Sequence, residues 1–142
     1  MICGEGITMT LLIVEPDKYL RDFLTRAFER SGYLVLAAVN EIDSLAFLAQ
    51  HMPAAIVLDL FPIRKAGALL DELRRFEHTA TIPVLGLVSG DHASTQQAQS
   101  LACDVYVHKP FDLEELLYQV TVLAGMPAAP KERDSLDRRR GA

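Results

Sequence analysis

Four polar side chains stand at the ends of short apolar runs, and their types suit one chemistry. Glu15 ends LLIVE, Asp59 lies in AAIVLDL, Ser89 ends PVLGLVS and Lys109 follows DVYVH. Two carboxylates brought together repel each other, and a hard cation such as Mg²⁺ relieves that repulsion while keeping waters free for a phosphoryl group. Asp59 could then attack a phosphorylated donor, while Lys109 and the Ser89 hydroxyl would bind the oxygens of the transferred group.

The apolar runs alternate with stretches of helical periodicity, and the alternation repeats five times. The runs occupy residues 11–15, 33–39, 54–60, 83–89 and 104–108. The stretches between and after them predict helices over 18–30, 41–51, 67–77 and 93–102, and a last helix capped by Asp112. Nearly continuous apolar strands that alternate with helices are typical of a parallel sheet covered on both faces. The sequence therefore predicts a doubly wound α/β fold with five parallel strands.

The strand order decides which polar residues meet. In the flavodoxin-like order 2-1-3-4-5, strands one and three are neighbours where the order reverses, and ligands bind beyond the carboxyl ends of the strands at that point. Glu15 and Asp59 are therefore expected to face one crevice, which Ser89 and Lys109 reach from strands four and five.

Length and composition predict one soluble domain. The chain has 142 residues, no apolar run near the roughly 20 residues of a membrane helix, and no signal-like start. We therefore expect a cytoplasmic protein without a membrane partner. Residues 1–8 are interpreted as an extension, 9–125 as the domain and 126–142 as a flexible tail or truncated linker.

Charge and cysteine spacing exclude two other classes of site. The net charge is −5, and the tail carries five basic and three acidic side chains, which leaves about −7 on the domain. Such a domain is a poor electrostatic match for nucleic acid, so no direct contact with DNA or RNA is expected. The two cysteines, Cys3 and Cys103, lack the spacing of a metal site.

Several motifs together resemble those of response-regulator receiver domains of two-component signalling. They are LLIVEPD, IVLDLFP with Gly67 eight residues after Asp59, VSG, and DVYVHKPF. The resemblance covers roughly residues 9–125. It implies that Asp59 accepts a phosphoryl group from a histidine kinase or a histidine phosphotransfer protein. It also implies that Glu15, Asp59 and the carbonyl of Phe61 hold Mg²⁺.

The same resemblance implies how a phosphorylated domain would signal. Lys109 matches the lysine of the motif, and its bond to Pro110 matches one that is cis in such domains. Tyr106 matches an aromatic switch whose inward or outward position reports phosphorylation. The face formed by residues 93–102, 104–108 and the last helix would engage a downstream protein or a second copy of the chain. No enzyme activity is expected beyond self-phosphorylation and self-dephosphorylation at Asp59.

Two positions depart from the family pattern. Pro16 stands where a second acidic residue is usual, so Mg²⁺ should bind more weakly and phosphotransfer should be slow or absent. Asp17 is first expected to cap the following helix, although it could reach back to the metal. On strand four, counting five residues from Pro83 selects Val88, whereas matching the hydroxyl selects Ser89, which we favour.

These departures leave a second interpretation open. The domain could be a pseudo-receiver, which uses the same fold for protein interaction or dimerisation without a phosphorylation cycle. An aspartyl-phosphate phosphatase of the dehalogenase-like kind is disfavoured, because Phe61 stands where that class needs a second acid.

Overall fold

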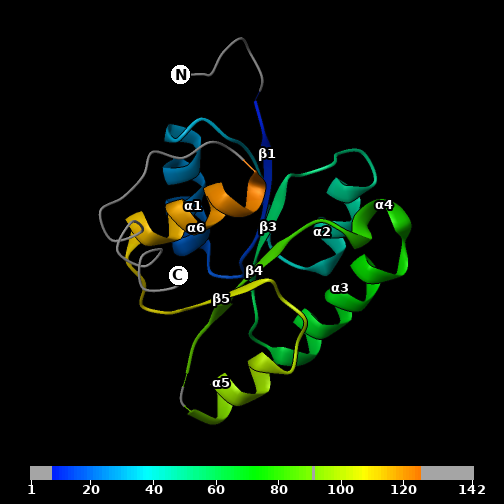
Figure 1. Cartoon of the computed structure of the whole chain (residues 1–142), viewed down its shortest axis with the longest axis vertical. Coiled ribbons are helices and arrows are strands. Elements are labelled where there is room, and N and C mark those ends of the chain that lie inside the picture. The colour runs from blue at the N-terminus through cyan, green and yellow to red at the C-terminus, as the bar shows by residue number, and fades with distance from the viewer. Residues whose placement is uncertain (1–7, 91, 126–142) are drawn as a thin grey trace, which may run out of the picture.

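A single sheet of five parallel strands forms the centre of the molecule (Figure 1). The structure is a computed structural model that describes residues 8–90 and 92–125, without the side chains of 92–94. The strands are β1 Thr10–Val14, β2 Leu34–Ala38, β3 Ala55–Asp59, β4 Val84–Val88 and β5 Val105–His108. Their order is β2-β1-β3-β4-β5, with parallel pairing throughout. The predicted fold class and strand order are confirmed.

Helices cover both faces of this sheet (Figure 1). Helices α1 (Lys18–Arg30) and α6 (Leu113–Ala124) lie on one face, and α2 (Glu41–Leu48), α3 (Ile63–Arg75) and α5 (His92–Gln99) lie on the other. Each face has its own apolar core. The first buries Leu24, Phe28, Leu116 and Val120 against the strands, and the second buries Leu48, Leu69, Leu73 and Ala98.

Local sequence accounts for where the elements begin and end. The inner strands β1, β3 and β4 are buried on both faces, as their continuous apolar runs require. Strand β2 lies at the edge of the sheet and leaves Leu34 52% exposed. Helix α1 ends at Arg30, as predicted, and Gly32 follows with a φ of 101°, in the left-handed region that glycine adopts without strain.

The predicted bounds of the third helix were wrong. Helix α3 begins at Ile63 rather than at residue 67, so Gly67 lies inside the helix and not at its start. Pro62 precedes the first helical residue and offers no N–H that the helix would leave unpaired. Helix α3 ends at Arg75, and a short helix, α4 (Glu77–Ala80), which the sequence did not predict, follows it.

Two other helices are shorter than predicted. Helix α2 ends at Leu48 instead of residue 51, and α5 ends at Gln99 instead of residue 102. After α5 the chain makes a tighter, 3₁₀-type turn, in which the backbone N–H of Leu101 donates to the carbonyl of Ala98, three residues earlier. The proposed tail and all but Thr8 of the proposed extension lie outside the described residues. Within the described ranges, no helix is both long and apolar enough to cross a membrane.

Candidate functional site

Three of the predicted site residues meet at the carboxyl edge of the sheet. Glu15 follows β1, Asp59 ends β3 and Lys109 follows β5. The Nζ atom of Lys109 lies 3.3 Å from Oε1 of Glu15 and 3.1 Å from Oδ2 of Asp59. One ammonium group therefore bridges the two carboxylates at the point where the strand order reverses.

Burial makes it costly to keep charge on the three side chains of this cluster. The side chains of Glu15, Asp59 and Lys109 are 1%, 8% and 21% exposed. Burial is the largest cause that raises the pKa of Glu15 from 4.5 to about 7, and the hydrogen bond and charge of Asp59 add to it. Burial alone would lower the pKa of Lys109, but the two carboxylates outweigh it and raise that pKa. The cluster thus favours additional positive charge beside its carboxylates.

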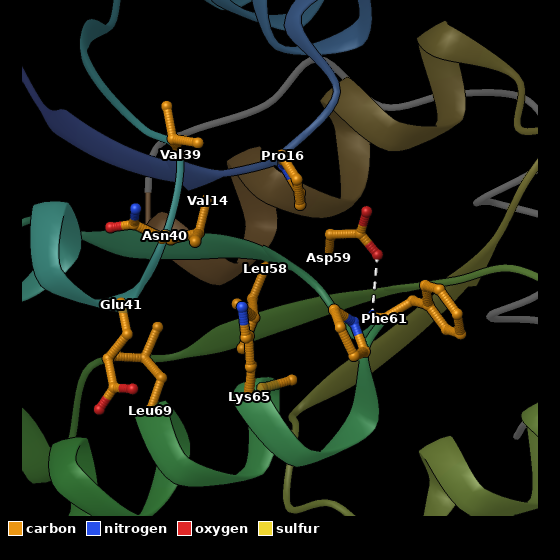
Figure 2. A pocket seen from close by; sticks show the side chains of 12 residues that line it. Val14, Pro16, Val39, Asn40, Glu41, Leu58, Asp59, Phe61, Lys65 and Leu69 are labelled. Atoms are coloured by element: carbon orange, nitrogen blue, oxygen red, sulfur yellow. Dashed lines mark hydrogen bonds between the residues drawn. The ribbon is translucent and has the colours of Figure 1, made fainter.

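Backbone groups fix the direction of both carboxylates. Oε2 of Glu15 accepts a hydrogen bond from the backbone N–H of Asp17 at 3.1 Å. Oδ1 of Asp59 accepts one from the backbone N–H of Phe61 at 3.0 Å (Figure 2). Each carboxylate therefore has one oxygen held by the main chain and the other by Lys109, so their relative positions are set by the fold.

The oxygens at this site fit a magnesium ion. Lys65 and Ala66 both donate their backbone N–H groups to the carbonyl of Pro62, so the hydrogen-bond ladder of α3 starts after Phe61. Glu15, Asp59 and the Phe61 carbonyl can then supply three oxygen ligands. Mg²⁺ usually keeps several waters, so three protein oxygens suffice. No cluster of three or more His, Cys, Asp or Glu side chains suited to a metal occurs within the described ranges.

The residues next to Glu15 do not add a side-chain ligand. Pro16 has none to offer, and Asp17 caps α1, as predicted: its Oδ1 accepts hydrogen bonds from the backbone N–H groups of Tyr19 at 2.9 Å and Leu20 at 3.4 Å. The Asp17 carboxylate is therefore committed to the helix start.

The structure separates the two candidates on β4. Val88 is 2% exposed and belongs to the core under α3 and α5, which also includes Leu58 and Leu60. Ser89 is partly exposed and lies one residue beyond the end of β4. In the described part of the chain, no hydrogen bond joins Ser89 to Asp59 or Lys109, so the hydroxyl is not in direct contact with the charged cluster.

Tyr106 is turned toward the loop that precedes β5. Its ring packs against the core that contains Val88, and its hydroxyl donates to the carbonyl of Leu101 and accepts from the backbone N–H of Cys103 at 3.3 Å. The Lys109–Pro110 peptide bond is cis, as the resemblance implied, and the Phe61–Pro62 bond is cis as well.

A pocket of about 260 Å³ opens beside Asp59, between β1, β3, α3 and the segment that joins β2 to α2 (Figure 2). Its floor is made of the buried side chains of Val14, Leu58 and Leu69, and Pro16 lies on its rim. Pro16 and Asp59 therefore both line this pocket.

One contributor to the site was missed from the sequence. The Nη1 atom of Arg21 donates to the carbonyl of Glu15 at 2.8 Å and to the carbonyl of Pro16 at 3.1 Å. An arginine on an amphipathic helix normally indicates a solvated face, so no sequence signal pointed to this role.

Comparisons with known proteins agree with this geometry. The family model of the response regulator receiver domain matches residues 11–121. The DNA-binding dual master transcriptional regulator RpaA of Synechocystis is 35% identical over 133 residues, which are 89% of this chain and 55% of RpaA. The chain thus spans about half the length of the curated relatives it matches.

Solved structures show the same fold. A response regulator from Chloroflexus aurantiacus has a TM-score of 0.74 at 28% identity, over 84% of this chain and 99% of that one. The receiver domain of a Pseudomonas aeruginosa sensor histidine kinase, which holds a magnesium ion in its active-site cleft, has a TM-score of 0.71 at 22% identity, over 84% and 99%. The chain therefore belongs to the response regulator receiver domain family of two-component signalling.

Proposed function

We propose that this domain takes a phosphoryl group onto Asp59 from a histidine kinase or a histidine phosphotransfer protein, and that it does so in the cytoplasm. The observation that carries the proposal is the Lys109 ammonium, which lies within 3.3 Å of both buried carboxylates at the carboxyl ends of the strands. A lysine that only stabilised the fold would not need to lie between two buried carboxylates whose other oxygens the backbone already orients.

The positions of these groups support the following transfer step. A carboxylate oxygen of Asp59 attacks phosphorus, an O–P bond forms, and the P–N bond of the phosphohistidine breaks, with its electron pair going to the histidine nitrogen. Lys109 stays beside Asp59 and neutralises charge on the phosphoryl oxygens. The Ser89 hydroxyl, which is not in contact with the charged cluster in this structure, would have to move toward Asp59 to bond one of these oxygens. Glu15, Asp59 and the Phe61 carbonyl would hold Mg²⁺, and the bound ion would further neutralise the charge that develops on those oxygens.

Output would pass through the face made by α5, β5 and α6. Tyr106 lies on β5, and its hydroxyl is bound to the loop that joins α5 to β5. A change in that loop would release the ring and alter the surface offered to a protein partner or to a second copy of the chain. Because Asp59 is itself the group modified, we propose no catalytic turnover beyond loss of the same phosphoryl group to water.

Pro16 favours a second candidate, the pseudo-receiver. A magnesium site with one side-chain ligand fewer binds its metal less tightly, and Val88 fills the end of β4 with an apolar group. In this alternative the domain acts through a constant surface, and Lys109 with its two carboxylates serves only to stabilise the fold.

Thermal unfolding with beryllofluoride, a mimic of a bound phosphoryl group, distinguishes the two candidates. The phosphorylation proposal predicts that Mg²⁺ and beryllofluoride together raise the unfolding temperature of the wild type and leave that of Asp59→Asn unchanged. An equal response in both proteins, or none in either at millimolar Mg²⁺, would refute that proposal and support the pseudo-receiver.

A further inference from the structure

The turn between β1 and α1 is tied down by one side chain of α1. The turn consists of Glu15, Pro16 and Asp17, which join β1 to α1, and it contains Glu15, one of the proposed metal ligands. Nη1 of Arg21 reaches back to two successive carbonyls of this turn, at 2.8 Å from that of Glu15 and 3.1 Å from that of Pro16. One guanidinium therefore holds the two peptide units on either side of Pro16, Glu15–Pro16 and Pro16–Asp17.

Without this arginine, the turn would have few bonds of its own. Pro16 has no N–H, so the turn has two donors. The N–H of Glu15 donates to the carbonyl of Ala38 at 3.0 Å, and that of Asp17 donates to the Glu15 side chain. The carbonyls of Glu15 and Pro16 are satisfied by Arg21, and an interaction of carbonyls with a charged donor is stronger than one with a neutral donor.

The Glu15 carboxylate depends on this arrangement. It is 1% exposed and lies beside the carboxylate of Asp59, a position that burial and repulsion both disfavour for a charged group. The Asp17 N–H that orients Oε2 belongs to the turn that Arg21 holds. If the turn relaxed, the Glu15 carboxylate would lower its free energy by rotating toward water. The site would then lose this ligand, and Pro16 has no side-chain oxygen to replace it.

We propose that Arg21 is a positioning residue for the magnesium site, which acts by holding the turn that aims Glu15 at Asp59. The inference rests on the proposed function, because it concerns the same metal. Arg21 needs no contact with the metal or the phosphoryl group. Two possible effects of removing Arg21 have opposite signs. Loss of its positive charge alone should tighten Mg²⁺ binding, whereas loss of its hold on the turn should weaken Mg²⁺ binding.

Magnesium titration by NMR of the full chain tests this inference, with Arg21→Met, Arg21→Lys and Arg26→Met compared with the wild type. Arg26 is exposed on the same helix and serves as the charge-matched control. Partners that orient metal ligands typically contribute about 10- to 100-fold in affinity. We expect Arg21→Met to weaken Mg²⁺ binding about tenfold. Arg21→Lys, which can bond one carbonyl, should weaken it less, and Arg26→Met should leave it unchanged.

Several results would overturn the inference. Unchanged affinity in both Arg21 variants, with a folded spectrum and reduced resistance to urea, would make Arg21 a structural residue only. Tighter binding in Arg21→Met with no change in Arg21→Lys would show a charge effect alone. If Arg21→Met does not fold, the affinity of Arg21→Lys decides. A wild type that binds no Mg²⁺ would refute the proposed metal site itself and this inference with it. A wild type that binds Mg²⁺, with Arg21 variants of equal affinity, would refute this inference alone.

Discussion

Replacing Glu15 by glutamine should change how stability depends on pH. The pKa of Glu15 is raised in the folded protein from 4.5 to about 7, mainly by burial and then by Asp59. Well below pH 4.5 the group is protonated in both the folded and the unfolded chain. As the pH rises toward 7 the unfolded chain ionises first, so the folded state loses stability, and the loss ends above the folded pKa.

The two pKa values set the size of this effect. One pKa unit corresponds to about 1.4 kcal/mol, so ionisation of Glu15 should cost the metal-free wild type about 3 kcal/mol of unfolding free energy across this range. Glutamine mimics the protonated acid and cannot ionise, so the Glu15→Gln variant should lack that loss. Mg²⁺ should restore stability to the wild type at high pH, because it binds the ionised carboxylate, and should do little for the variant.

Urea unfolding in EDTA, at several pH values between about 5 and 8, measures the difference in unfolding free energy between the two proteins. Glu29→Gln removes an exposed carboxyl from α1 and should follow the wild type. A difference between wild type and Glu15→Gln that stays constant within about 1 kcal/mol over this range would refute the view that Glu15 is held, buried, against Asp59.

Three further substitutions test other contacts of the site. Lys109→Met should destabilise the metal-free domain by about 3 kcal/mol, because two buried carboxylates lose their shared cation. The loss should be larger at pH 8 than at pH 6, urea unfolding at both pH values measures it, and equal losses would contradict it. Asp17→Ala should cost about 1 kcal/mol of unfolding free energy, from loss of the helix cap, with unchanged Mg²⁺ affinity by NMR titration; weakened affinity would make Asp17 a ligand. Pro16→Asp should tighten Mg²⁺ binding about tenfold in the same titration and lower metal-free stability, and an unchanged Kd would show that residue 16 does not face the metal.

Much of the fold could be predicted because its signals are local. The five apolar runs and the stripes of α1 and α6 each reflect burial, and burial on both faces leaves little choice other than a parallel sheet. The start of α3 could not be predicted, because its first turn contains the basic residues Arg64 and Lys65 and therefore shows no apolar periodicity. The need for glycine at residue 86 could not be predicted either. A Cβ added to Gly86 would lie 2.6 Å from Cδ1 of Leu60, and this constraint exists only once β3 and β4 are side by side.

The site was predictable to the extent that strand ends define it. Glu15, Asp59 and Lys109 each stand at the end of an apolar run, so topology alone brings them together. Arg21 was not predictable, since its role depends on the direction of one side chain and on two carbonyls in a turn. The same limit applies to Ser89, because its distance from the charged cluster depends on where β4 ends rather than on which residue types it contains.

Intact-mass spectrometry after incubation with a small phosphodonor tests the central claim most directly. Wild type and Asp59→Asn would each be treated with phosphoramidate in Mg²⁺ and, separately, in EDTA. The account predicts a single phosphoryl adduct in the wild type that requires Mg²⁺ and is absent from Asp59→Asn. A wild type that remains unmodified in Mg²⁺, or an adduct that persists in Asp59→Asn, would contradict the assignment of Asp59 as the phosphoryl acceptor.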